Sequence, residues 1–86
     1  MVKKNMCRGL IKNIEKLHTT QLGNIRIKTN LELKIDDVVK WCKKEIINAD
    51  NIIKQGKNWY INNGKCIITV NSSSYTIITA HKIKIC

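Results

Sequence analysis

The two histidines are the side chains best suited to acid–base chemistry in this sequence. His18 precedes two threonines, and His81 is followed by Lys82 in the last strand-like run. An imidazole titrates near neutral pH, so one ring can accept a proton while a second ring donates one. Sharing one site, the two rings could deprotonate a ribose 2′-hydroxyl and protonate the leaving 5′-oxygen. This chemistry cleaves RNA without a metal.

Two basic residues are expected to stabilise the negative charge that develops on the phosphorus during such a reaction. Arg26 and Lys82 are the candidates for this role. The histidines also have structural explanations that stay open. His18 beside two threonines suits a helix cap or a turn, and His81 can be a packed strand residue.

A second group of side chains is expected to bind the nucleic acid and to shape the site. The run Lys57-Asn58-Trp59-Tyr60 combines a positively charged lysine with two aromatic rings that could stack on nucleobases. Cross-strand packing is the alternative, and only one of the two neighbouring rings can face the core. The expected nucleic-acid-binding residues are Lys57, Asn58, Tyr60, Thr69, Asn71, Tyr75 and Thr79.

The charge of the chain favours a polyanionic partner. Its 16 Lys and Arg residues against 6 Asp and Glu residues give a formal net charge of +10 over 86 residues. Lysine and arginine that contact phosphates release condensed counterions. Because only Arg8 and Arg26 are arginines, recognition of shape and backbone is expected rather than base-specific reading, with RNA favoured over DNA. Solubility or AT-rich coding is the alternative explanation of the lysines.

Cofactor and metal chemistry have no sequence support. The four cysteines contain no CxxC pair, so no metal site is expected. Phosphate-loop and dinucleotide-binding motifs are absent as well, so no cofactor is expected. The sequence shows no signal peptide and no apolar run that could span a membrane, which predicts a cytoplasmic protein with reduced thiols. Cys42 and Cys66 are expected to be small core residues.

The chain is expected to form a single α+β domain over residues 1–86, with two to three N-terminal helices packed on a C-terminal antiparallel sheet of three to four strands. Helical spacing of apolar residues predicts a first helix from Lys4 to Leu17. A short second helix or turn follows the possible caps at 18–20 and runs toward Asn30. The third helix begins after Asp36 or Asp37 and continues to about Ala49.

Alternating residues predict strands at 57–62, 65–71 and 75–83, the first two joined by the turn residues Asn63 and Gly64. The expected pairs are Asn62 with Lys65, Tyr60 with Ile67 and Asn58 with Thr69. The residues expected in the core are Trp59, Ile61, Cys66, Ile68 and Val70.

The length of the serine loop decides which face carries His81. A three-residue loop pairs Asn71 with Tyr75 and places Thr79 and His81 on the polar face. A two-residue loop sends His81 inward and places Thr76 and Lys82 on the polar face. The three-residue loop is the preferred interpretation.

Several longer motifs point to a family. They are His18-Thr19-Thr20 with Leu22-Gly23, Arg26 and Asn30-Leu31, then Asp37-Val38-Val39 with Trp41-Cys42, then Gly56-Lys57-Asn58-Trp59-Tyr60, and Thr69-Val70-Asn71 running to Ser74 through Lys82. Together they resemble a bacterial domain-of-unknown-function family over about Leu17 to Lys82. The resemblance implies no established activity.

The order of elements is also similar to the barnase and RelE-like class of small ribonucleases, which carry catalytic residues on an exposed sheet face and often act as toxins. The predicted sheet has no Asp or Glu, so a histidine- or lysine-based variant would be needed. The leading hypothesis is a metal-independent endoribonuclease of the toxin type, with an acidic antitoxin as a possible partner. The alternatives are a non-catalytic binder of RNA or a ribonucleoprotein, such as a phage-encoded inhibitor of a nuclease system, and a protein-interaction module.

Overall fold

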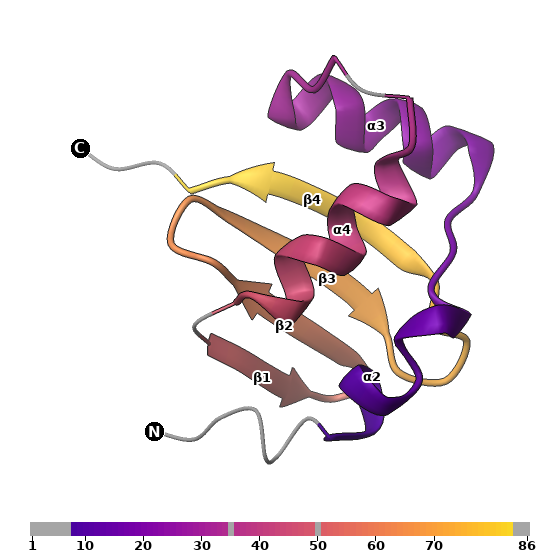
Figure 1. Cartoon of the computed structure of the whole chain (residues 1–86), viewed down its shortest axis with the longest axis vertical. Helices are drawn as coiled ribbons and strands as arrows, with labels where there is room; N and C mark the ends of the chain where they lie inside the picture. The colour runs from indigo at the N-terminus through magenta and orange to yellow at the C-terminus, as the bar shows by residue number, and fades with distance from the viewer. Residues whose placement is uncertain (1–7, 35, 50, 84–86) are drawn as a thin grey trace.

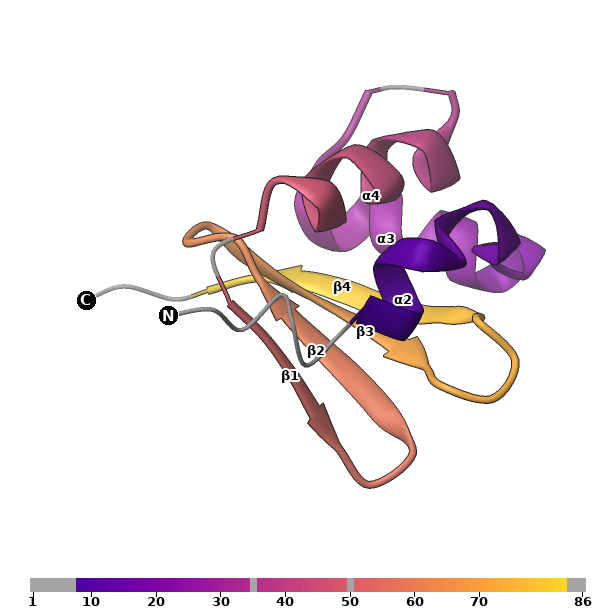
Figure 2. The ribbon, with the colours of Figure 1, turned by 60° about the horizontal axis from the view of Figure 1, so that its bottom comes forward.

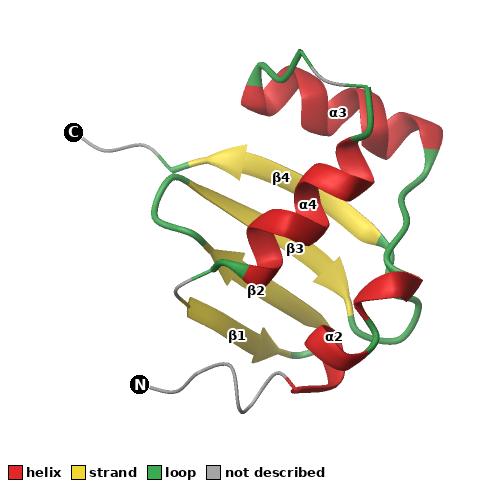
Figure 3. Ribbon diagram, viewed as in Figure 1, coloured by secondary structure: helices red, strands yellow, loops and turns green. Residues whose placement is uncertain are grey.

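Helices precede an antiparallel sheet in the computed structural model, which describes residues 8–34, 36–49 and 51–83 (Figures 1 and 3). The helical elements are α2 (Arg8–Lys12), the 3-10 helix η1 (Ile14–Lys16), α3 (Gln21–Leu31) and α4 (Val38–Ile47). The strands are β1 (Asn51–Gln55), β2 (Asn58–Asn62), β3 (Cys66–Asn71) and β4 (Ile77–Lys82). The predicted α+β class is confirmed.

The first predicted helix is interrupted. Its expected start at Lys4 lies outside the described residues, and the described part ends at Lys12 instead of continuing through Leu17. Asn13 Nδ2 donates to the carbonyl oxygen of Gly9 at 2.9 Å. The same carbonyl oxygen also accepts from the Asn13 amide at 3.1 Å, so Asn13 closes the last turn. Asparagine does not favour helix interiors. At Leu17 the backbone has an extended conformation, and the Leu17 side chain is buried in the core.

The segment after His18 forms a full helix, α3. Thr20 is its N-cap, and the Thr20 hydroxyl oxygen accepts a hydrogen bond from the Gly23 amide at 2.9 Å. A Cβ at Gly23 would collide with the hydroxyl of Thr19, which donates to the carbonyl oxygen of Ile77 on β4. Gly23 thus permits the close packing of α3 on β4.

The prediction for α4 is confirmed. Asp37 caps the helix, with its Oδ1 accepting from the Lys40 amide at 2.9 Å. Val38, Cys42 and Ile46 form the buried stripe, and the helix lies across one face of the sheet (Figure 1).

The sheet has the order β1-β2-β3-β4, with every neighbouring pair antiparallel. Figure 2 shows α2, α3 and α4 on the same side of it. None of the described segments covers the opposite side. One face of the sheet therefore builds the core, and the described part of the chain leaves the other face uncovered.

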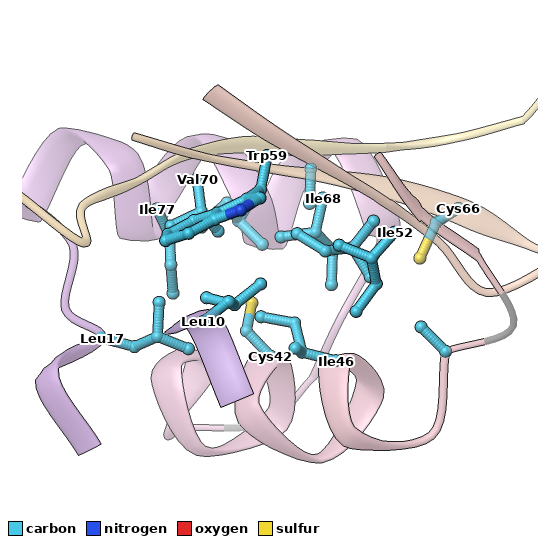
Figure 4. Packing of buried hydrophobic residues seen from close by; sticks show 14 of the residues in the cluster. Leu10, Leu17, Cys42, Ile46, Ile52, Trp59, Cys66, Ile68, Val70 and Ile77 are labelled. Atoms are coloured by element: carbon cyan, nitrogen blue, oxygen red, sulfur yellow. The ribbon is translucent and has the colours of Figure 1, made fainter. Parts of the chain in front are cut away.

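The core lies between α4 and the covered face of the sheet (Figure 4). The five sheet residues predicted to be buried, Trp59, Ile61, Cys66, Ile68 and Val70, are all buried. Leu10, Leu17, Cys42 and Ile46 meet them from the helical side. Aliphatic side chains thus supply most of the interior, as the low aromatic content requires.

The predicted register of the β2–β3 hairpin is wrong by two residues. Tyr60 pairs with Thr69, not Ile67. The Asn63 amide donates to the Cys66 carbonyl oxygen at 3.3 Å, so the loop residues are Gly64 and Lys65. Asn63 Oδ1 also accepts from the Lys65 and Cys66 amides, each at 2.9 Å, which fixes the turn one position later than expected. A shift by two leaves every side chain on its predicted face.

The serine loop is longer than either predicted length. The Asn71 amide donates to the Thr76 carbonyl oxygen at 2.9 Å, which leaves residues 72–75 in the loop. The predicted pairing of Asn71 with Tyr75 is wrong, because Tyr75 turns the chain with a φ of 60°.

A β-bulge then shifts the register of β4 once more. Val70 pairs with Ile77, whereas Thr69 pairs with Thr79, so Ile78 has no cross-strand partner. The fourth residue of the serine loop and the bulge at Ile78 each shift β4 by one residue. Each shift moves the following side chains to the other face of the sheet, so the two shifts cancel. Thr79 and His81 therefore lie on the polar face, as the three-residue loop predicted.

Candidate nucleic-acid interface

The uncovered side of the sheet is a continuous surface that we call the open face. Its central row runs from Ile53 through Tyr60 and Thr69 to Thr79, each paired with the next across neighbouring strands. The other members of the open face are Asn51, Gln55, Asn58, Asn62, Ile67, Asn71 and His81. Carboxamides and hydroxyls thus surround one aromatic ring.

The open face contains no carboxylate. Residues 51–86 include five lysines and no Asp or Glu, and all six acidic residues precede position 51. A polyanion approaching this side would meet no negatively charged side chain from the sheet. The strands themselves supply hydrogen-bonding groups, and the positive charge comes from the border.

Tyr60 and Trp59 have separate roles, as their alternation requires. The Trp59 ring is buried in the core, with its centroid 5.5 Å from that of Tyr75. Tyr60 is half-buried on the open face, where Asn58 Nδ2 donates to its hydroxyl at 3.4 Å. Of the two rings, Tyr60 is available for stacking.

His81 lies exposed on the open face, across from Ile67 on β3. Lys82, the next residue, points to the helical side and forms an ion pair with Glu32, Nζ to Oε2 at 3.2 Å. The expected joint action of His81 and Lys82 on one phosphate is not supported by this arrangement, because neighbouring strand residues face opposite sides.

His18 is held at the beginning of β4. Its amide donates to the Tyr75 carbonyl oxygen at 3.2 Å, and the Ile77 amide donates to the His18 carbonyl oxygen at 2.7 Å. The His18 ring contacts the Lys16 carbonyl oxygen through Nδ1 at 2.9 Å and the Thr76 hydroxyl through Nε2 at 3.0 Å. A carbonyl oxygen only accepts, so Nδ1 donates to the Lys16 carbonyl oxygen.

The two histidines do not share a pocket. His18 contacts Thr76, which precedes His81 by five positions along an extended chain. At a rise of about 3.3 Å per residue, reduced at the bulge of Ile78, the two rings lie at positions separated by up to about 16 Å. One phosphodiester cannot contact both rings, so the predicted pair of imidazoles is not assembled.

Arg26 is exposed on α3 beside the outer edge of β4. It lies one helical turn from both Gly23, which faces the Ile77 carbonyl, and Asn30. Asn30 Nδ2 donates to the Ala80 carbonyl oxygen at 3.2 Å. Arg26 therefore lies at the border of the open face, between the two histidines.

The outer edge of β4 is protected from further strand pairing. Thr19 Oγ1 donates to the Ile77 carbonyl oxygen at 2.8 Å, and Asn30 covers the Ala80 carbonyl. Unpaired edges invite other strands, so these contacts protect this edge of the sheet from strand addition.

Two other expected binding residues have contrasting positions. Lys57 is exposed in the β1–β2 turn, and its carbonyl oxygen accepts from the Ser72 amide at 2.8 Å, at one end of the open face. Tyr75 is not on the open face. It packs on Trp59, and its hydroxyl accepts from Asn13 Nδ2 at 3.3 Å.

The buried thiols are unsuited to nucleophilic chemistry at neutral pH. Burial, with smaller contributions from Cys66 and Glu45, raises the pKa of Cys42 to about 12. Burial also raises the pKa of Cys66. Within residues 8–34, 36–49 and 51–83, no three His, Cys, Asp or Glu side chains are grouped to hold a metal ion. The helices of this part of the chain are all too short or too polar to cross a membrane.

Sequence reasoning missed the contribution of β1 to the open face. Asn51, Ile53 and Gln55 extend the surface beyond Tyr60. Two signals could have identified this strand. Ile52 and Ile53 favour a strand, and Gly56 with a φ of 63° forms a tight turn with Lys57 before β2.

The comparisons with known proteins identify the family and nothing further. Residues 11–81 match the family described as Protein of unknown function (DUF3781), and the chain belongs to it. No curated protein and no solved structure matches the chain.

Proposed function

We propose that this member of the DUF3781 family binds single-stranded RNA across the open face. The observation that carries the proposal is the composition of that face, where Tyr60 is surrounded by carboxamides and hydroxyls, with no carboxylate among them. Sequence-tolerant binding of single strands commonly combines an aromatic stacking surface with basic groups along the backbone.

Tyr60 supplies the stacking surface in this proposal. A base stacked on an aromatic side chain contributes about 1–3 kcal/mol. Asn58 and Asn71 pair across β2 and β3 next to Tyr60. Asn71 Oδ1 already accepts from the Ser73 and Ser74 amides at 2.9 and 3.0 Å, so its Nδ2 is the group left to donate to a base edge. Thr79 offers its hydroxyl to the 2′-hydroxyl groups that distinguish RNA from DNA, whereas Thr69 beside it is buried.

The phosphate backbone would follow the border of the sheet. Arg26 lies along the outer edge of β4, and Lys57 lies in the β1–β2 turn, both exposed. Contacts of this kind position the strand and make affinity depend on salt. A single strand is favoured over a duplex because only unpaired bases can lie flat on the ring.

Cleavage of the bound RNA, as by a toxin-type endoribonuclease, is a second candidate function. The exposure of His81 on the open face favours it. Because His18 lies at the other end of β4, His81 would be the one imidazole on the open face that could act as acid or base in this reaction. An antitoxin or another acidic protein would remain a possible partner.

Binding can be tested with a fluorescein-labelled twelve-nucleotide uridine RNA by fluorescence anisotropy at 50 mM and 200 mM salt. We expect micromolar or tighter binding at low salt and a loss of about tenfold or more at high salt. A duplex RNA of the same length should bind more weakly. Absence of binding at 50 mM salt would refute the proposal. Electrophoresis of the RNA after incubation tests cleavage.

A further inference from the structure

Trp41 lies between two hollows on the helical side of the molecule. The first hollow has a volume of about 320 Å³ and is lined by Asp37, Lys40, Trp41 and Lys44. These positions recur at helical spacing, so they form one face of α4. Trp41 itself is half-buried and packs against the core with its inner side.

The second hollow adjoins the other side of Trp41. It has a volume of about 290 Å³ and extends from α4 to the end of α3 and the β2–β3 turn. Leu31, Leu33 and Cys66 give it an apolar lining. Its size is close to the lower limit of ligand pockets, about 300 Å³, and suits one bulky side chain.

The charges around the hollows are mainly positive. The bordering lysines are Lys40, Lys44, Lys65 and Lys82. Both carboxylates of the lining already accept hydrogen bonds, Asp37 from the Lys40 amide and Glu45 from the side chain of Asn63. The ion pair of Lys82 with Glu32 is exposed and contributes little.

We propose that Trp41 and its two hollows bind an acidic peptide segment of a partner protein that carries bulky apolar side chains. The apolar side chains would enter the hollows on either side of the Trp41 ring, and the carboxylates would meet the lysines. Tryptophan at the centre of such a surface commonly contributes much of the binding energy. This surface lies on the opposite side of the sheet from the open face, so peptide and RNA can bind together.

The lining favours a peptide over RNA at this surface. Leu31, Leu33 and Cys66 offer no side-chain partner for the polar edges of a base, and the polar lining residues Glu45 and Asn63 are already hydrogen-bonded to each other. Burying a base edge against the apolar part of the lining is unfavourable. A leucine or phenylalanine side chain has no such cost. The lysines at the border then select for negative charge in the flanking residues.

Three fluorescein-labelled twelve-residue peptides test the required chemistry by anisotropy. The first repeats Glu-Glu-Phe-Leu, the second repeats Glu-Glu-Ser-Gly, and the third repeats Lys-Lys-Phe-Leu. We expect the first peptide to bind at least about tenfold more tightly than either of the others. Equal binding of the first two peptides would overturn the proposal, because charge alone would then explain the affinity.

Charge reversal locates the surface. The double substitution Lys40→Glu with Lys44→Glu should weaken binding of the first peptide by about tenfold or more. Its matched control, Lys12→Glu with Lys54→Glu, changes the net charge equally at exposed residues outside the hollows and should change binding by about twofold at most. Equal losses in the two variants would overturn the assignment.

Trp41→Ala gives a second measure, with circular dichroism to check the fold. We expect loss of peptide binding of about tenfold or more and retention of uridine RNA binding. If the Lys40 and Lys44 reversals abolish RNA binding while open-face variants do not, the surface binds RNA and the peptide proposal is wrong. Open-face variants test RNA binding, and variants around Trp41 test peptide binding. Failure of the peptide proposal can therefore be distinguished from failure of the proposed function.

Discussion

The Thr76 hydroxyl and Nε2 of His18 are hydrogen-bonded at 3.0 Å, at the point where the backbones of the same two residues form a parallel bridge. The histidine is thus joined to the first residues of β4 by its main chain and its side chain. This position explains why His18 is separated from His81, which lies at the other end of the strand.

His18→Ala should lower the free energy of unfolding by about 1–2 kcal/mol, because both side-chain hydrogen bonds of the ring are lost. The affinity for RNA should stay within about twofold, since the ring is not part of the open face. Urea unfolding and RNA anisotropy on the same preparation measure both quantities. An unchanged stability with a large loss of RNA binding would instead place His18 in the binding site.

Gly23→Ala should destabilise the protein by about 1–3 kcal/mol. The new Cβ would displace the Thr19 hydroxyl, which caps the Ile77 carbonyl oxygen. Gly9→Ala is the matched control, because a Cβ there meets no atom within 4 Å. It should stabilise α2 by about 0.5–1 kcal/mol. Similar effects of the two substitutions in urea unfolding would contradict the close packing of α3 on β4.

The stability of the protein should fall at high pH because of Cys42. Burial raises the pKa of this thiol from 9.0 to about 12, so the folded chain retains a proton that the unfolded chain loses. The resulting stability is complete below pH 9 and is lost as the pH rises toward 12. At about 1.4 kcal/mol per pH unit, the loss approaches about 4 kcal/mol.

Urea unfolding of the parent and Cys42→Ala at pH 8, 10 and 11 tests this dependence. Lysine and tyrosine titrate in both proteins, so the difference between them reports the thiol. We expect the parent to lose stability more steeply than Cys42→Ala. Parallel curves would show that Cys42 ionises equally in the folded and unfolded chains.

Much of the fold follows from local signals in the sequence. Asp37 and the stripe of Val38, Cys42 and Ile46 predict α4 closely. The alternation from Trp59 to Val70 predicts the buried face of the sheet even though the register is shifted by two residues. Side-chain period is a more robust signal than pairing, because a shift of two residues keeps every face.

The register of β4 against β3 could not be predicted from the alternation of polar and apolar residues. The four-residue loop and the bulge at Ile78 each add one residue, and neither leaves a glycine or proline as a marker. The separation of His18 from His81 is also a tertiary property. It depends on hydrogen bonds between residues that are far apart in sequence.

The RNA affinity of Tyr60→Ala, with Tyr60→Phe as its control, tests the central proposal most directly. Both variants leave the core on the helical side of the sheet unchanged, but only Tyr60→Phe keeps an aromatic ring on the open face. Anisotropy with the uridine RNA at 50 mM salt should show a loss of about tenfold or more for Tyr60→Ala and a change of about twofold at most for Tyr60→Phe. Equal affinity of the parent and a folded Tyr60→Ala would contradict binding of RNA across the open face.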